Sequence, residues 1–480
     1  MTEEREKNIK TTIFESAHAL LQTISTSLGP KGLDKMLIKD NKTTVTNDGA
    51  TILKFFTDHP IHQILSNVSN CQDEECGDGT TSVVVLICSL LDAVRGLVGV
   101  HPSTICDHLE KAKAMAIEYI EWVKVPISKE NIYNSVVTSL NSKIVNSSVE
   151  MAEAAIQAME YAKGQKRDIR IVKKVGGIVD DISVHRGLLF DSDIKTERRM
   201  VKVAAIQFCI SAPKTNMDSK ILVDKPELME KVILDERKYI LEICKKIKQT
   251  GCQLLLIQKS ILRDSLSDLG RHFLKQLNIL TVDRIERKDI ESLSSWIRPV
   301  SDVDLLTPES LVEVEIQNTE GMLEIVDKGC TVVIRGCDDL VLDEADRSFN
   351  DALSVVRCLN EEPFLVPGGG AVETGISVKI MQSKEGLVTV MRQIAKAFEG
   401  IPYFLSQNAG LNSVETLSEL RKMVLSNPSY GVSVRGPKTS DMLDDDNVVQ
   451  PSKIAKSVVS LAIETVIYIL KIDDILPSRR

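Results

Sequence analysis

The sequence predicts a multi-domain α plus α/β protein, in which helical segments at both ends of the chain enclose an α/β middle. Three observations lead to this fold class. The chain has 480 residues, and a chain of this length usually divides into several domains because a single hydrophobic core rarely grows so large. Apolar residues recur at helical spacing near both ends, and strand-like apolar runs alternate with a helical pattern between them. We therefore expect two or three domains.

The opening block is predicted to be mostly helical. A helical pattern of apolar residues starts at Ile13, and the Gly-Pro pair at 29–30 should end that helix. A short strand is expected at 43–46, and the Asn, Asp and Gly at 47–49 favour a turn. The continuous apolar run that begins at Val83 predicts a helix buried on most of its circumference.

The pattern changes to mixed α/β after Pro126. A helix is predicted at 264–277, and strands are predicted at residues 169–172, 201–208, 254–257, 279–282 and 331–334. The charge-dense segment 216–245 has few apolar residues, so we expect it to be exposed. From Ala345 onward the pattern is helical again, and the chain ends in a helix around 454–470.

The charge balance argues against a nucleic-acid-binding protein. Lys and Arg number 59 against 68 Asp and Glu, and the net charge of −9 has the wrong sign for neutralising phosphates. The N-terminal residues lack the apolar core of a signal peptide, and the apolar stretches 83–91 and 457–470 are too short or too interrupted to span a bilayer. The ten cysteines have no regular spacing, which is typical of reduced thiols. We expect a cytoplasmic protein.

One loose group of residues could be drawn as a zinc site: His59, His62, Cys71 and Cys76. Zinc sites usually contain closely spaced cysteine pairs, and no CxxC pair accompanies this group. We therefore favour a structural role for these four side chains.

The most informative segment is GDGTTS at 77–82, at the start of an apolar helix. Glycines let the backbone approach phosphate oxygens, the N–H groups and positive dipole of a helix start attract the anion, and hydroxyl groups donate hydrogen bonds to it. Asp78 is suited to hold a Mg²⁺ ion that bridges those oxygens. A polar helix cap would show the same letters, so the segment alone leaves both interpretations open.

Two glycine-rich turns suit the same kind of site. LGPKG at 28–32 is a tight turn at a helix end, and GGGA at 368–371 opens another helix. Each alone would more often be a helix cap or a linker. A P-loop of the pattern GxxxxGK[ST] is absent, because no Gly-Lys dipeptide occurs in the sequence.

Five separated segments stand in the order and context seen in group II chaperonins, the family of the eukaryotic cytosolic chaperonin. They are TSLGPKG at 26–32, TNDGATIL at 46–53, GDGTTS at 77–82, RSFNDAL at 347–353 and GGGA at 368–371. The chain resembles this family over essentially its whole length. Further stretches match one subunit type within the family: 139–143, 207–215, 255–264, 448–451 and 469–474.

The resemblance implies a chaperonin fold with a discontinuous helical equatorial ATPase domain, an intermediate hinge domain and an inserted α/β apical domain with a helical protrusion. The implied boundaries are equatorial 1–126 and 365–480, intermediate 127–198 and 329–364, and apical 199–328. Client proteins should bind the apical domain, where the helix 264–277 mixes polar residues with leucines and Phe273. An ordinary amphipathic core helix would show the same pattern.

The resemblance also implies a site for ATP and Mg²⁺. Asp78 would bind Mg²⁺, and Asp351 would orient or deprotonate the attacking water with help from Asp48, a role that requires a carboxylate. Lys143 would sense the terminal phosphate, and Gln450 is expected near the ribose, where many relatives carry an acid. The other implied nucleotide contacts are Gly29, Pro30, Gly79, Thr80, Thr81, Ser82, Asn141, Ser142, Gly369 and Gly370. Without the resemblance, Asp351 would be interpreted as a solvated acid on a helix and Asp48 as a turn residue.

The implied function is that of an ATP-dependent chaperone subunit in a hetero-oligomeric double ring that folds clients such as actin and tubulin. ATP hydrolysis, assisted by Mg²⁺, would time the closure of the lid. Two alternatives are a structural ring member with negligible turnover, which the three aspartates disfavour, and an ATP-dependent kinase, for which nothing suggests a phospho-acceptor pocket. No nucleic-acid or membrane partner is expected.

Overall fold

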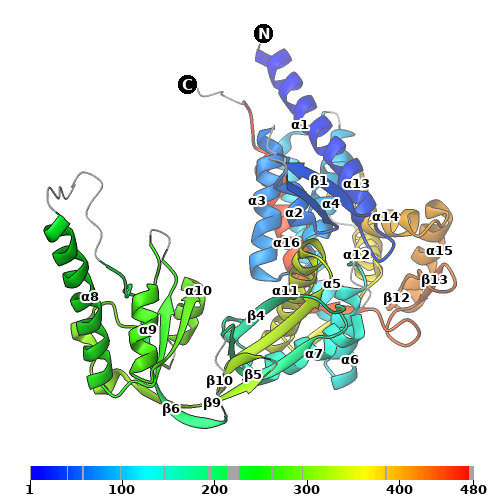
Figure 1. Ribbon diagram of the computed structural model, residues 1–480. Helices are drawn as coiled ribbons and strands as arrows, with labels where there is room; N and C mark the ends of the chain where they lie inside the picture. Colours follow the sequence, from blue (N-terminus) through cyan, green and yellow to red (C-terminus); the bar gives the residue numbers. More distant parts are fainter. Residues whose placement is uncertain are drawn as a thin grey trace. The chain divides into compact units, whose positions relative to one another are not determined.

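The computed structural model divides the chain into two compact units (Figure 1). The first unit comprises Met1–Glu160, Lys173–Ile182 and Ile334–Arg480, and the second comprises Tyr161–Val172 and Ser183–Val333. The predicted apical segment 199–328 lies within the second unit. The residues that the structure describes are 2–39, 42–56, 59–97, 99–143, 148–192, 197–212, 226–260, 263–294, 296–319, 321–383 and 386–474.

Helix α4 (Thr80–Arg95) forms the centre of the first unit. Its apolar side chains from Val83 to Leu91 have no exposed surface. Neighbouring helices cover α4 on several faces, which explains its continuous apolar run. These neighbours include α1 (Thr2–Ile24), α3 (Pro60–Glu75), α13 (Val388–Phe398) and α16 (Ser452–Leu470). Helices from both ends of the chain therefore share one core (Figure 1).

The remaining elements of the first unit surround this core. The helices are α2 (Gly49–Leu53), α5 (Pro102–Val123), α6 (Lys129–Leu140), α7 (Ser148–Tyr161), α11 (Asp339–Glu361), α12 (Ala371–Gln382), α14 (Gly400–Asn408) and α15 (Ser413–Ser426), with the 3₁₀ turn η1 (Ser25–Ser27). The small sheets are the hairpin β1 (Lys35–Lys39) with β2 (Lys42–Thr46), the row β14 (Val449–Pro451), β11 (Phe364–Pro367) and β3 (Val125–Pro126), and the pair β12 (Tyr430–Val432) with β13 (Thr439–Asp441).

A mixed sheet with helices packed on it forms the second unit. The strands lie in the order β4-β10-β9-β6-β7-β8, and β5 pairs with β10. Their bounds are β4 (Ile169–Val175), β5 (Ser183–Phe190), β6 (Arg199–Ile206), β7 (Leu254–Gln258), β8 (Leu280–Ile285), β9 (Val312–Thr319) and β10 (Met322–Gly336). The pairings β6–β7 and β7–β8 are parallel, whereas β9 is antiparallel to both β6 and β10.

The sheet separates two apolar cores. Side chains of β6 alternate between them, as the two-residue period of a strand requires. Val203 and Ala205 belong to the core that contains residues of α10 (Arg287–Leu293). Ala204 belongs to the core formed with α8 (Pro226–Gln249) and α9 (Asp268–Gln276). Short 3₁₀ turns also occur: η2 (Lys166–Asp168), η3 (Val303–Leu305) and η4 (Pro308–Ser310).

The predicted order of helices and strands is confirmed, whereas several boundaries differ. Strands occur at each predicted position, although β10 starts nine residues before the predicted 331–334. The first helix starts at Thr2 instead of Ile13, and α11 starts at Asp339 instead of Ala345. The start of α1 is largely polar and shows no apolar repeat, and the start of α11 contains only a short apolar run at 340–342.

Two local predictions were wrong. Residues 47–49 are not a free turn, because Asp48 is the N-cap of α2. Asn and Asp favour turns and helix caps for the same reason, since their side chains accept backbone hydrogen bonds. The helix predicted at 264–277 starts only at Asp268, because the Ser267 hydroxyl accepts a hydrogen bond from the Gly270 N–H and caps it.

The charge-dense segment 216–245 is exposed only in part. Residues 216–225 lie outside the described residues. In α8, residues 229–239 are largely exposed, whereas Ile240 and Cys244 are buried in the core of the second unit. No helix in the described ranges is long and apolar enough to cross a membrane.

Candidate active site

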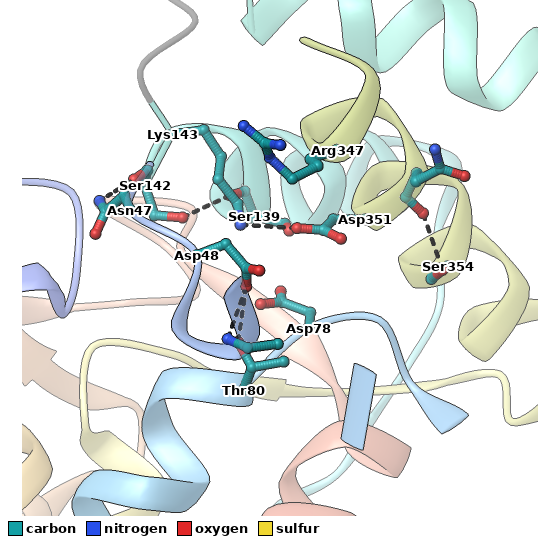
Figure 2. A network of polar contacts seen from close by, with 12 residues as sticks. Asn47, Asp48, Asp78, Thr80, Ser139, Ser142, Lys143, Arg347, Asp351 and Ser354 are labelled. Atoms are coloured by element: carbon teal, nitrogen blue, oxygen red, sulfur yellow. Dashed lines mark hydrogen bonds and ion pairs between the residues drawn. The ribbon is translucent and has the colours of Figure 1, made fainter. Parts of the chain in front are cut away.

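Four charged side chains meet at the start of α4: Asp48, Asp78, Lys143 and Asp351 (Figure 2). The Lys143 ammonium lies 2.7 Å from Oδ2 of Asp351, and these side chains are only 11% and 15% exposed. Thr80, the first residue of α4, donates its hydroxyl hydrogen to Asp48 Oδ1 at 3.3 Å. All of these residues belong to the first unit.

Asp48 is held in place by the helix that it caps. Its carboxylate accepts the N–H groups of Ala50 at 3.3 Å and Thr51 at 2.9 Å, and the Thr51 hydroxyl at 2.7 Å. Burial alone would raise the pKa of Asp48, but the charge of Lys143 and the hydrogen bonds from Thr51 and Ala50 together lower it. Asp48 is therefore a fixed, ionised carboxylate.

Asp351 has the opposite character, although it pairs with the same lysine. Burial raises the pKa of Asp351 to about 7, Lys143 opposes this effect, and the charges of Asp48 and Asp78 add to it. Burial would lower the pKa of Lys143, yet the nearby carboxylates raise it, Asp351 most strongly. Lys143 therefore stays protonated, and Asp351 can exchange a proton near neutral pH.

The segment that carries Lys143 is tied to the segment that carries Asp48. The Asn47 side-chain amide donates a hydrogen bond to the backbone carbonyl of Ser142 at 2.8 Å (Figure 2). The Ser142 hydroxyl donates to the Ser139 carbonyl at 2.8 Å, and Asn141 caps the C-terminus of α6. The cap and these bonds fix the backbone just before Lys143.

The turn that carries Asp78 is built from two glycines in the left-handed region. Gly77 has φ +71° and Gly79 has φ +80°, which side chains other than glycine rarely adopt. The Gly79 N–H donates to Oδ1 of Asp78 at 2.7 Å, and α4 begins at the next residue. The turn thus presents a carboxylate beside the N-terminus of a buried 16-residue helix, where the dipole is positive.

Thr81 and Ser82 complete the first turn of α4. Thr81 lies against α2, since a Cβ atom on Gly49 would be 2.6 Å from its hydroxyl oxygen. Backbone N–H groups and hydroxyls at such a helix start suit an anion such as phosphate.

The donor set fits a divalent cation that is shared with phosphate oxygens. Three carboxylates surround one lysine, so negative charge is in excess. In the described part of the chain, no three His, Cys, Asp or Glu side chains are placed to hold a metal by themselves. Mg²⁺ usually takes one or two carboxylates and completes its shell with substrate phosphates and water. Asp78 beside a helix start fits that pattern.

Gly29 and Gly370 lie on a second set of contacts, around α14. A Cβ atom on Gly29 would lie 2.4 Å from Leu405, and one on Gly370 would lie 2.7 Å from Pro402. Gly29 has φ +83°. The helix predicted to end at the Gly-Pro pair ends slightly earlier, at Ile24, and η1 lies between it and the turn at 29–30. Pro30 in this turn is exposed.

Gly369 and Gln450 are joined through the small sheet. Gly369 follows β11 and accepts the Val432 N–H at 2.8 Å, and Gly370 caps α12. Gln450 in β14 pairs with Val366 in β11. Strand β14 also packs against α6, which ends just before Lys143, and against α11, which carries Asp351.

The structure therefore brings together part of the predicted site directly. The acidic residues, Lys143 and Thr80 are in one network. Among the described residues, no hydrogen bond or ion pair joins that network to Gly29, Pro30, Gly369, Gly370 or Gln450. Those residues are connected to it only through the elements that carry them.

Two residues of this region were missed by the sequence prediction. Asn47 is part of the TNDGATIL motif at 46–53, but nothing in the sequence indicated that its side chain would contact Ser142. Gln72 of α3 contacts the turn at Asp78 and is fully buried. A signal for Gln72 was present, because the buried stripe Ile61, Leu65, Ser69 and Gln72 follows helical spacing.

The fold and the site agree with one protein class. The chain matches the TCP-1/cpn60 chaperonin family over residues 20–480 and belongs to that family. The resemblance inferred from the five motifs is thereby confirmed.

The relatives narrow the comparison to one subunit type. The chain is 58% identical to T-complex protein 1 subunit delta of Encephalitozoon cuniculi, with 100% of both chains covered. It is 40% identical to T-complex protein 1 subunit delta of Dictyostelium discoideum, over 99% of this chain and 96% of the relative. It is 41% identical to T-complex protein 1 subunit delta of Homo sapiens, over 97% and 93%. The subunit type indicated by the additional sequence stretches is the one that these relatives carry in their names.

Proposed function

We propose that this chain is an ATP-hydrolysing subunit of a hetero-oligomeric chaperonin double ring in the cytoplasm. The observation that carries the proposal is the convergence of Asp48, Asp78, Lys143 and Asp351 at the N-terminus of α4, in a chain of the chaperonin family. Clients would include proteins such as actin and tubulin, and hydrolysis would drive closure of the lid.

In this proposal the start of α4 binds the phosphates. The N–H groups and hydroxyls from Thr80 to Ser82 donate to phosphate oxygens, Gly79 lets the backbone approach them closely, and the helix dipole favours their negative charge. Asp78 would hold Mg²⁺, which supplies charge neutralisation at the transferring phosphoryl group. Asn141 and Ser142 hold the backbone from which Lys143 reaches the terminal phosphate.

Asp351 would act as the general base for the attacking water. A base works best when its pKa lies near the working pH, and the pKa of Asp351 is raised to about 7. Its proton can return to solvent at neutral pH between turnovers. Asp48, which stays ionised, would orient the water without competing for the proton. A phosphate near Lys143 would draw the ammonium away from Asp351 and leave that carboxylate free to accept a proton.

The glycine turns would enclose the rest of the nucleotide. Gly29, Pro30, Gly369 and Gly370 lie in tight turns where backbone can approach a ligand closely. Gln450 would face the ribose from β14. The hinge role of the intermediate segments 127–198 and 329–364, and client binding by the apical segment 199–328, belong to the same proposal.

A structural ring member without turnover is the competing proposal, and Asp351 separates the two. We expect Asp351→Asn to reduce the hydrolysis by this subunit about 10²- to 10⁴-fold, the usual contribution of a general base. The measurement is ADP formed in a single turnover by the assembled complex containing the variant. The amount of ADP formed in that turnover should fall by the fraction that this subunit contributes to the complex, whereas binding of Mg·ADP should persist.

The matched control is Asp339→Asn, an exposed acid in the first turn of the same helix. It should leave the amount of ADP formed unchanged. Unchanged hydrolysis with Asp351→Asn would support the structural role instead, and failure of the wild-type chain to enter a complex would contradict the subunit proposal. Transfer of phosphate to a small substrate would favour a kinase.

A further inference from the structure

Gln72 is a polar side chain in a position where the fold asks for an apolar one. It lies in the last turn of α3, on the face that carries Ile61 and Leu65, and it has no exposed surface. A buried amide requires partners for its donor and acceptor groups. The identity of those partners indicates what Gln72 does.

Both ends of the Gln72 amide are bonded. Nε2 donates to the backbone carbonyl of Asp78 at 2.8 Å, and Oε1 accepts the Ser457 hydroxyl of α16 at 2.6 Å. The carbonyl of Asp78 can only accept, so the NH₂ group must face it. The backbone carbonyl of Gln72 also accepts the N–H groups of Cys76 and Gly77, at 2.8 Å and 3.2 Å. One residue thus connects α3 and α16 to the turn that carries Asp78.

These contacts immobilise one peptide unit, the one between Asp78 and Gly79. Its C=O is held by Gln72, and its N–H is held by Oδ1 of Asp78 at 2.7 Å. Gly79 has a positive φ and no side chain, so this peptide could otherwise rotate at little cost. A rotation would break both bonds and release the Asp78 carboxylate from the N–H group that orients it.

We propose that Gln72 is a positioning residue that holds the Asp78 carboxylate in the direction required to bind a divalent cation. The inference rests on the proposed function, because it assumes that Asp78 binds Mg²⁺ together with a nucleotide. Partners that orient a metal ligand typically change metal affinity 10- to 100-fold when they are removed. Gln72 should therefore affect Mg²⁺ and leave metal-free nucleotide binding alone.

The test measures ADP binding by the full-length chain at increasing Mg²⁺, and separately with EDTA. Gln72→Met keeps the length of the side chain and removes both hydrogen-bonding groups. Gln72→Glu keeps an acceptor for Ser457 but, when ionised, has no donor for Asp78. We expect both variants to need at least about tenfold more Mg²⁺ for half-maximal ADP binding. Their ADP affinity in EDTA should equal that of the wild type.

The matched control is Ser69→Ala. Ser69 lies one turn earlier on the same buried face, and its hydroxyl has no partner among the described residues. This variant should keep the wild-type Mg²⁺ dependence. Ser457→Ala, which removes the bond that steadies Oε1 and keeps the bond to Asp78, should shift the dependence in the same direction by a smaller factor. It serves if the Gln72 variants do not fold.

The outcomes separate the inference from the proposed function. Wild-type Mg²⁺ dependence in the folded Gln72 variants, or in Ser457→Ala when those variants do not fold, overturns the inference. An equal loss of ADP affinity with and without Mg²⁺ also overturns it, because that result indicates general damage to the site. If the wild-type chain binds no ADP at any Mg²⁺ concentration, the proposed nucleotide site itself is wrong.

Discussion

The charges around Lys143 decide which acidic side chain can hold a proton. Asp48 has hydrogen bonds from its own helix start in addition to the charge of Lys143, and together they lower its pKa. Asp351 has Lys143 as its ion-pair partner and lies near two other carboxylates. The same buried position that would make Asp351 costly as an anion makes it useful as a proton acceptor.

This difference predicts a pH dependence of stability in the absence of nucleotide. The pKa of Asp351 rises from 3.8 to about 7 on folding, so the folded state binds the proton more tightly. The resulting stabilisation is complete below pH 3.8, declines as the pH rises, and is lost above about pH 7. Asp351→Asn lacks this contribution.

We therefore expect the free energy of unfolding of the wild type to fall relative to Asp351→Asn by about 3 kcal/mol between pH 5 and pH 8. The fall amounts to about 1.4 kcal/mol for each of the roughly two pH units between pH 5 and the pKa of about 7. Denaturation of the two proteins across this range measures the difference. The same comparison with Asp339→Asn, which is exposed, should be nearly independent of pH. A pH-independent difference in stability between the wild type and Asp351→Asn would mean that the Asp351 carboxyl group of the wild type is ionised throughout this range.

At the scale of elements, α11 and the turn after α3 support each other. Arg357 donates to the carbonyls of Glu74 and Glu75 at the end of α3, and the Cys358 thiol lies 3.7 Å from the carbonyl of Cys76. A Cβ atom on Gly77 would lie only 2.3 Å from Cβ of Ser354. The helix that carries Asp351 therefore packs directly on the turn that carries Asp78.

Gly77→Ala should weaken the packing of α11 on the turn after α3 and lower the stability of the protein. A side chain at φ +71° costs about 1–2 kcal/mol, and the clash with Ser354 adds about 1–3 kcal/mol. We expect a correspondingly lower denaturation temperature. Ser354→Gly in the same chain should recover the part due to the clash.

Gly410→Ala is the control for backbone strain alone. Gly410 has φ +76°, and a Cβ atom there meets nothing within 4 Å. It should lose only about 1–2 kcal/mol. If Gly77→Ala is no worse than Gly410→Ala, the close contact with α11 does not constrain the turn.

At the scale of the whole molecule, the second unit has its own interior. Its sheet is covered on both faces by separate apolar cores. The buried residues of one core lie between Leu188 and Ile325 in the sequence, and those of the other lie between Ala204 and Leu306. Within the described ranges, neither core contains a residue of the first unit. A unit with a complete core can fold alone.

We expect a fragment of residues 183–333 to fold independently. It should unfold cooperatively on heating and resist limited proteolysis, except near the charged first turns of α8. Circular dichroism with temperature provides the measurement. A fragment that ends at 285 loses β9 and β10, two strands of the sheet, and should be unfolded as a control. A non-cooperative transition in the longer fragment would show that its stability depends on the first unit.

The order of helices and strands, the buried character of α4 and the motifs of the candidate site could be inferred from the sequence alone. These features depend on residues that are near one another in the chain, so periodicity and spacing carry them. The helix start at Thr80 and the glycines that precede it are examples.

Only the tertiary structure decided which of those residues touch. The ion pair of Lys143 with Asp351, the bond from Asn47 to Ser142 and the burial of Gln72 join segments that are far apart in sequence or depend on a neighbouring helix. The raised pKa of Asp351 follows from that burial and from charges supplied by other segments, so no local pattern contains it. The sequence determined which chemical groups are available, and the packing of helices from both chain ends determined their protonation and direction.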